Sequence, residues 1–173
     1  EFSGKFEAKA TNPSHRGAYY QEDAAEKGMA LIQAKYKDTK IYWLVDLAED
    51  RIYSARFFAY GGKLSLGIGE TLCSQVEGLT VVEACTLKGR KIEAELRDAP
   101  ETPSVPEAKL IAFENIDHLL KAVETEYPAA KAVAKASMAV KDQSGSAPQT
   151  TKELSLAEQA WLGLNKEEQV QQV

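Results

Sequence analysis

Residues 52–62 read Ile-Tyr-Ser-Ala-Arg-Phe-Phe-Ala-Tyr-Gly-Gly, and this stretch decides how the chain is organised. Its aromatic and β-branched residues favour a β-strand, which the glycine pair then ends. Directly after the glycines, apolar residues recur at every fourth position, at Leu64, Ile68, Leu72 and Val76. That spacing predicts a helix with one apolar stripe, followed by Gly78 in a position typical of a C-terminal cap. The chain therefore passes from sheet to helices at Gly61-Gly62.

Two further strands are predicted upstream of this stretch. Apolar residues alternate imperfectly over 29–36, and residues 41–45 form a second short run, Ile-Tyr-Trp-Leu-Val. Turns at Asp38-Thr39 and at 48–50 separate the three runs, which predicts an antiparallel meander. A short amphipathic helix over 2–10, with Phe2 and Phe6 four residues apart, precedes the sheet, and Asn12-Pro13 ends it.

Helices are predicted downstream. Thr80 and Glu83 form a capping box that opens a short helix, and residues 88–96 supply another. Three prolines between 100 and 106 enforce an extended loop. From Glu107 to Ala136 the apolar positions favour a long helix, interrupted or bent near Pro128, whose apolar stripe covers the sheet.

The predicted fold class is α+β, with a three-stranded antiparallel sheet packed against several helices and a helical C-terminal tail. The domain spans 1–136. Residues 137–153 are predicted to be a flexible linker, because 141–150 are small and polar and cannot bury enough apolar surface to become ordered. Residues 154–173 carry two helix-cap signals and an apolar face that includes Trp161, too large for a lone helix to leave in water. We expect this tail to have a partner.

Composition and charge narrow the class of protein. The 173 residues include 21 Lys and Arg against 26 Asp and Glu, which gives a net charge of −5. The basic residues are interleaved with acidic ones in the sequence, so we expect no nucleic-acid partner. No apolar run approaches the roughly 20 residues that a membrane span needs, and no secretory leader opens the chain. We therefore expect no membrane association and a cytoplasmic location.

Several short sequence segments occur in the same order as similar segments of a known protein family. They are Tyr42-Trp43-Leu44-Val45-Asp46, Ala55-Arg56-Phe57-Phe58-Ala59-Tyr60-Gly61, Gly78-Leu79-Thr80-Val81-Val82-Glu83-Ala84, Val105-Pro106-Glu107-Ala108-Lys109 and the stretch 121–127. Together with the order of elements, they resemble the scaffold domain of the NifU/IscU family of iron–sulfur cluster assembly proteins. The resemblance implies a SufE/NifU-like fold over residues 1–136 and a role in cluster assembly.

The resemblance also implies three positions for cluster-ligating cysteines, and none holds a cysteine here. The family's Gly-Cys-Gly turn places its cysteine at Gly62, and the family's His-Cys pair falls on Ile111 and Ala112. The connection at 37–40 is too short for the loop that carries the first ligand. Iron–sulfur clusters are held by thiolates or imidazoles, so we expect no cofactor on this chain, although relatives carry an iron–sulfur cluster.

The remaining cysteines and histidines do not indicate a relocated site. Cys73 and Cys85 lie in different predicted helices without CxxC spacing, so we expect two buried free thiols. His15 and His118 are isolated imidazoles, and a lone histidine is far more often structural than a metal ligand. No P-loop, dinucleotide fingerprint or nucleophile elbow is present, so we expect neither a metal site nor an enzyme. Transient iron binding through carboxylates is left open.

Three functions fit these observations. The first is a NifU-like assembly protein whose degenerate scaffold domain docks partners, such as a cysteine desulfurase, rather than holding a cluster. Pro106 and Lys109 are its predicted docking residues, retained from the family's chaperone-recognised segment, although Glu107 replaces a proline there and weakens the case for chaperone binding. The second is a non-catalytic binding or regulatory module outside cluster assembly. The third is a domain that positions or dimerises an attached module, and a homodimer of this chain is also left open.

One further expectation concerns the end of the chain. Residues 164–170 resemble the first helix of the small C-terminal domain that follows the scaffold domain in NifU-like proteins and binds a cluster through a CxxC pair. The given sequence ends at Val173 before any such pair. The resemblance therefore predicts that the native protein continues past Val173.

Overall fold

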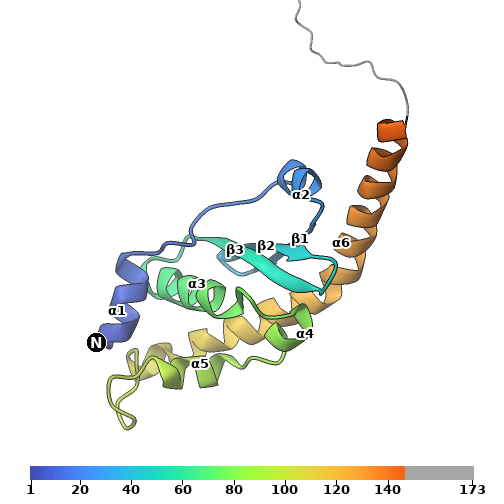
Figure 1. Cartoon of the computed structure of the whole chain (residues 1–173). Helices are drawn as coiled ribbons and strands as arrows, with labels where there is room; N and C mark the ends of the chain where they lie inside the picture. The colour runs from blue at the N-terminus through green and yellow to red at the C-terminus, as the bar shows by residue number, and fades with distance from the viewer. Residues whose placement is uncertain (147–173) are drawn as a thin grey trace, which may run out of the picture. The chain divides into compact units, whose positions relative to one another are not determined.

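The computed structural model describes residues 1–146. Residues 1–135 form one compact unit, and the following residues belong to a second. The elements of the first unit are arranged around a three-stranded sheet (Figure 1). None of the helices within residues 1–146 is both long and apolar enough to cross a bilayer.

The sheet is an antiparallel meander in the order β1-β2-β3, as predicted. Its strands are β1 (Ala30–Tyr36), β2 (Thr39–Asp46) and β3 (Arg51–Ala59). The register pairs Ile32 with Trp43 and Trp43 with Ala55, which puts these three apolar side chains on one face. All three are fully buried, so this face is the core face of the sheet.

The helices mostly lie on the core side of the sheet. They are α1 (Gly4–Thr11), α2 (Gln21–Lys27), α3 (Lys63–Val76), α4 (Val81–Ala84), α5 (Gly89–Glu95), the 3₁₀ helix η1 (Glu107–Phe113) and α6 (Glu114–Ser146). Figure 1 shows α2 on the opposite side of the sheet from α3. There Ala24 of α2 packs with Leu31 and Leu44 in a small second cluster. The α+β fold class is confirmed.

Close packing between α3 and its neighbours depends on two glycines. A Cβ at Gly67 would lie 2.3 Å from the Phe6 ring, and a Cβ at Gly69 would lie 2.4 Å from the Phe57 ring. The helix can therefore approach both aromatic rings only because these positions lack side chains. These two glycines therefore serve close packing.

Several boundaries differ from the sequence prediction. Residues 107–113 are 3₁₀ rather than α-helical, and the α-helix that follows is continuous through Pro128 as far as Ser146. Residues 137–146 of the predicted flexible linker are thus helical. Small polar residues have only a weak preference against the helix, so the helix that begins at Glu114 continues through them. The remainder of the linker and the tail at 154–173 lie outside the described residues. The short helix α2 was not predicted.

Candidate functional site

The three places where the family resemblance puts cluster ligands occupy one end of the sheet. The β1–β2 turn joins the segment after β3 there, because the Tyr60 amide donates to the Asp38 carbonyl oxygen at 3.1 Å. The Ser65 hydroxyl, in the first turn of α3, donates to the Asp38 carboxylate at 2.7 Å. Gly62 is the N-cap of this helix, with a φ of 85° in the left-handed region that favours glycine.

The third place faces the same turn across a hollow of ≈ 270 Å³. Its lining residues are Tyr36, Lys37, Ile111, Ala112, Glu114, Asn115 and His118. It therefore joins the end of β1 to η1 and the start of α6. We call these residues, with Asp38 and Gly62, the ligand corner. Sequence comparison with the family thus selected residues that the fold brings together.

Side chains other than cluster ligands occupy the ligand corner. The Tyr36 and His118 rings stack, with centroids 4.4 Å apart and planes 12° from parallel. The Lys37 amine lies 5.6 Å from the centre of the Tyr36 ring. Lys37 is part of the β1–β2 turn and, like Gly62, has a positive φ, here 55°. The hairpin at 37–40, which the family resemblance predicts to be too short for the loop with the first ligand, is a tight turn. The corner offers an amine, an aromatic stack, one imidazole and the carboxylates of Asp38 and Glu114, a set that lacks the thiolates of an iron–sulfur site.

The two thiols lie elsewhere. Cys73 is fully buried in α3, and burial raises its pKa well above the ordinary thiol value, with Glu70 and Glu77 adding to the effect. Cys85 follows α4, and burial together with Glu124 raises its pKa as well. Both are free, as predicted for cysteines without CxxC spacing, but the prediction that both are buried is wrong for Cys85. Cys85 is half-buried, because it lines a hollow between the end of α4 and α6. Raised pKa values disfavour the thiolate form that binds metal. Within residues 1–146 no three His, Cys, Asp or Glu side chains are grouped to hold a metal ion.

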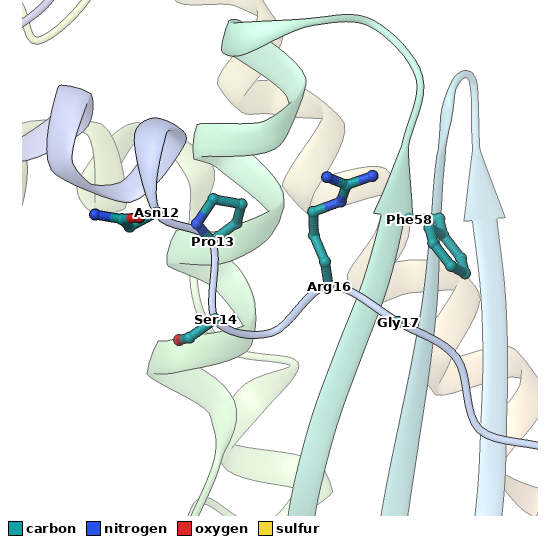
Figure 2. A pocket seen from close by; sticks show the side chains of 6 residues that line it. All are labelled: Asn12, Pro13, Ser14, Arg16, Gly17 and Phe58. Atoms are coloured by element: carbon teal, nitrogen blue, oxygen red, sulfur yellow. The ribbon is translucent and has the colours of Figure 1, made fainter.

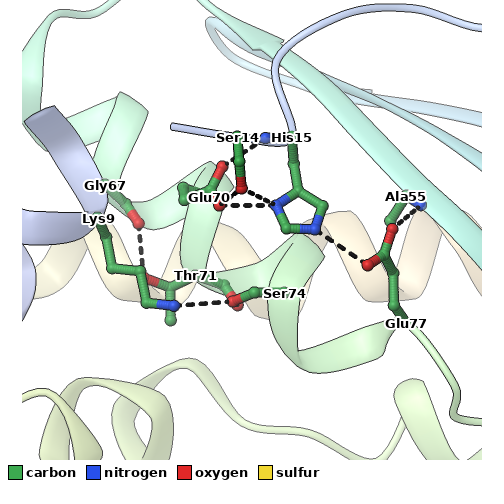
Figure 3. Close-up of polar contacts among 9 residues, drawn as sticks. All are labelled: Lys9, Ser14, His15, Ala55, Gly67, Glu70, Thr71, Ser74 and Glu77. Carbon is green, nitrogen blue, oxygen red and sulfur yellow. Dashed lines mark hydrogen bonds and ion pairs between the residues drawn. The ribbon is translucent and has the colours of Figure 1, made fainter. Parts of the chain in front are cut away.

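His15 belongs to a polar network that the sequence analysis did not anticipate (Figure 3). Its Nδ1 lies 2.6 Å from one Glu70 carboxylate oxygen and its Nε2 lies 3.0 Å from Glu77. Ser14 donates its hydroxyl to Glu70 as well, and the Glu77 carboxylate accepts from the Ala55 amide. Burial lowers the pKa of His15, but the two carboxylates outweigh it, so the net pKa is raised. We call His15, Glu70 and Glu77 the histidine latch.

The histidine latch holds the N-terminal segment against the exposed edge of the sheet. The Phe57 amide donates to the His15 carbonyl at 3.0 Å, and the Gly17 amide donates to the Phe57 carbonyl at 3.0 Å. Residues 15–17 therefore run beside β3 as a short extra strand. No local sequence signal could reveal this arrangement, because Glu70 and Glu77 lie 55 and 62 residues from His15.

The predicted docking residues lie at the surface of η1. Pro106 is its N-cap, and the Lys109 amide donates to the Pro106 carbonyl at 2.7 Å. The Lys109 amine lies 5.5 Å from the centre of the Phe2 ring, and Lys63, next to Gly62, lies 5.3 Å from the same ring. Ile111 on η1 is 65% exposed. These contacts place the docking residues beside the ligand corner.

Comparisons with known proteins bear on the fold and family. The model of the family described as NifU-like N terminal domain matches residues 2–132. One similar solved structure is a candidate iron–sulfur cluster assembly scaffold protein for the SUF system from Fervidobacterium islandicum, with 14% identity, a TM-score of 0.41 and coverage of 70% of this chain and 88% of that one. Another is the N-terminal part of a nitrogen-fixing NifU-like protein from Brucella abortus, with 13% identity, a TM-score of 0.42 and coverage of 71% and 94%. The comparison with curated proteins found no match.

Proposed function

The chain belongs to the NifU-like N-terminal domain family, and on that premise we propose that it serves iron–sulfur cluster assembly by docking partner proteins without holding a cluster itself. The observation that carries the proposal is the content of the ligand corner. Gly62 and Ala112 hold the positions that the family resemblance gives to two of the ligands, and the hairpin at 37–40 is too short for the loop with the first. A stacked Tyr36–His118 pair lines the hollow beside Lys37 and Ala112. A cationic amine and an alanine methyl group cannot bind iron.

Docking is supported by what surrounds the ligand corner. Lys109 is exposed on η1, and Ile111 exposes 65% of its surface. A partner that covers Ile111 would remove its exposed apolar surface from water, and an acidic group on that partner would pair with Lys109. The corner therefore keeps an accessible surface while the ligands are missing. We infer that an assembly enzyme such as a cysteine desulfurase recognises this surface, and that the domain over 1–136 acts as a non-enzymatic competitor or adaptor.

A binding experiment tests the docking part of the proposal. Cysteine desulfurase from the same organism is immobilised, and the chain is passed over it alone or with a cysteine-bearing scaffold protein. We expect the chain to bind and to compete with that scaffold. Lys109→Glu should weaken binding by about tenfold, because a charge at the centre of an interface is reversed. Lys91→Glu, an equal charge change on exposed α5, is the matched control and should bind like the parent chain. Absence of desulfurase binding would reject docking to this enzyme.

A further inference from the structure

The outer face of the sheet, opposite the core, collects basic and aromatic side chains from distant parts of the sequence. The register sets Lys35 of β1 opposite Lys40 of β2, and Lys40 opposite Phe58 of β3. The neighbouring row pairs Tyr42 with Arg56. α2 covers only the other end of this face, at Leu31 and Leu44. We use the term cationic sheet face for the open remainder, which consists of Lys35, Lys40, Arg56, Phe58 and Tyr60, with the half-buried Tyr42 at its border with α2.

The three cations of this face, Lys35, Lys40 and Arg56, have no carboxylate partner in the described part of the chain. Every ion pair there involves other basic residues. Lys40 instead lies 5.1 Å from the centre of the Tyr42 ring, and Arg56 lies 4.3 Å from that of Tyr19. Glu126 of α6 lines a hollow with Lys35 and Lys40 but forms no ion pair with either.

Leaving these charges together is unfavourable for the isolated protein. Lys35 and Lys40 are directly opposite each other across two strands, a placement in which like charges destabilise a sheet. The chain has five more acidic than basic residues, so carboxylates are available to neutralise the face, yet the fold leaves it positive. An unneutralised cluster in an acidic protein indicates a surface whose complement is supplied by a partner.

Aromatic rings lie between the cations. The Phe58 ring packs edge-on against Tyr42 at 6.3 Å and parallel to Tyr60 at 6.5 Å. Tyr60 is 79% exposed. Beside Phe58 lies an open hollow of ≈ 650 Å³, lined also by Asn12, Pro13, Ser14, Arg16 and Gly17 of the latched segment (Figure 2). Exposed aromatic residues and arginine are the side chains most enriched where proteins bind one another.

We propose that the cationic sheet face docks an acidic segment of a partner protein, whose carboxylates meet the three cations while an apolar side chain enters the hollow beside Phe58. That the partner is a protein rests on the proposed function in cluster assembly. Charge complementarity argues for a short acidic segment, because the positive face is limited to three cations on a chain of net charge −5. A long polyanion would meet the acidic surroundings as well.

The test measures the anisotropy of a short fluorescein-labelled peptide of glutamate, leucine and tryptophan as the full chain is added at low salt. The face variant is Lys35→Glu with Lys40→Glu, and the matched control is Lys88→Glu with Lys91→Glu. None of these four side chains makes a hydrogen bond or ion pair in the described residues, so both variants should fold, which thermal unfolding checks. Both change the net charge equally. We expect the face variant to bind at least about tenfold more weakly and the control to match the parent.

A second variant separates the rings from the charges. Tyr60→Ala should weaken the peptide several-fold and make the remaining binding more sensitive to salt, because only the electrostatic contribution is left. Equal weakening in the face and control variants would overturn the proposal, as would absence of peptide binding or tighter binding of an oligothymidylate of equal charge. Loss of peptide binding with intact desulfurase binding rejects only this surface. Loss of desulfurase binding with intact peptide binding rejects only the proposed function.

Discussion

Replacing His15 by glutamine should destabilise the domain through the histidine latch. The His15 side chain is 17% exposed and that of Glu70 is 4% exposed, with 2.6 Å between them. Removing one partner of a buried ion pair costs about 3–5 kcal/mol, because the other charge is left uncompensated. Glu70 keeps its hydrogen bonds from the Ser14 hydroxyl and the His15 amide, so we expect the lower end, about 3 kcal/mol. For a domain of this size the melting temperature should fall by roughly 10 °C.

The destabilisation should depend on pH in a defined direction. The pKa of His15 is raised in the folded chain above its ordinary value of 6.5. Between these two values the folded chain binds more protons than the unfolded chain, so stability falls as pH rises. The stabilisation by His15 is therefore complete below about pH 6.5 and is lost as pH rises through the raised pKa. The difference between parent and variant should narrow from pH 6 toward alkaline pH.

Chemical denaturation of both chains across this pH range measures the effect. Glu77→Gln is a suitable control, because the Glu77 side chain is 34% exposed and the amide oxygen of glutamine can still accept from Ala55. It should cost less than about 1 kcal/mol. Equal stability of the parent and His15→Gln at pH 6, or a difference that stays constant up to pH 9, would refute the reasoning.

Three further outcomes follow from buried groups. Gly89→Ala should destabilise by more than about 2 kcal/mol in denaturant, because a Cβ there would lie 1.8 Å from the Phe113 carbonyl oxygen; stability within error of the parent would contradict the packing. Glu93→Gln should cost about 3 kcal/mol, because Glu93 is buried and its pair with Arg97 is 2.9 Å long. Burial raises the pKa of Glu93, but hydrogen bonds from Arg97 and Ser104 lower it more, so the net pKa is lowered. The stabilisation by Glu93 is therefore present above the pKa of the unfolded chain and is lost as the pH falls through the lowered pKa. Acid titrations of the parent and Glu93→Gln chains would measure this loss. Cys73 should react with a thiol reagent no faster than the chain unfolds, and rapid labelling of two thiols per folded chain would contradict its burial.

Much of the fold follows from local patterns. The three strands, the apolar stripe of α3 and the capping box before α4 were all predictable, because each depends on residues close in sequence. α2 was not, since only Ala24 of its seven residues is buried and no apolar stripe marks it. Its ends depend on single contacts: Asp23 accepts from the Tyr20 amide at 2.7 Å, and Gly28 has a left-handed φ of 68°. Such signals are too weak to predict an element of this length.

The candidate sites divide in the same way. Gly62 and Ala112 could be selected from the sequence because the family pattern places ligands there. The β1–β2 turn lies beside both segments, since Asp38 accepts from the Tyr60 amide and Lys37 lines one hollow with Ala112. The histidine latch and the cationic sheet face had no such guide. Lys35 and Arg56 are separated in the sequence by acidic residues, and only the strand register gathers the cations on one face. The order of charges along the sequence therefore did not predict the cluster of cations that the strand register forms on the outer face.

Anaerobic reconstitution with ferrous iron, sulfide and reductant tests the central claim most directly. After desalting, iron and acid-labile sulfide are measured per chain together with the visible absorption spectrum. We expect iron and sulfide at background level and no charge-transfer bands, since no thiol lines the ligand corner and both thiols of residues 1–146 have raised pKa values. A stable, near-stoichiometric cluster that survives desalting would contradict the claim that this domain docks partners without holding a cluster.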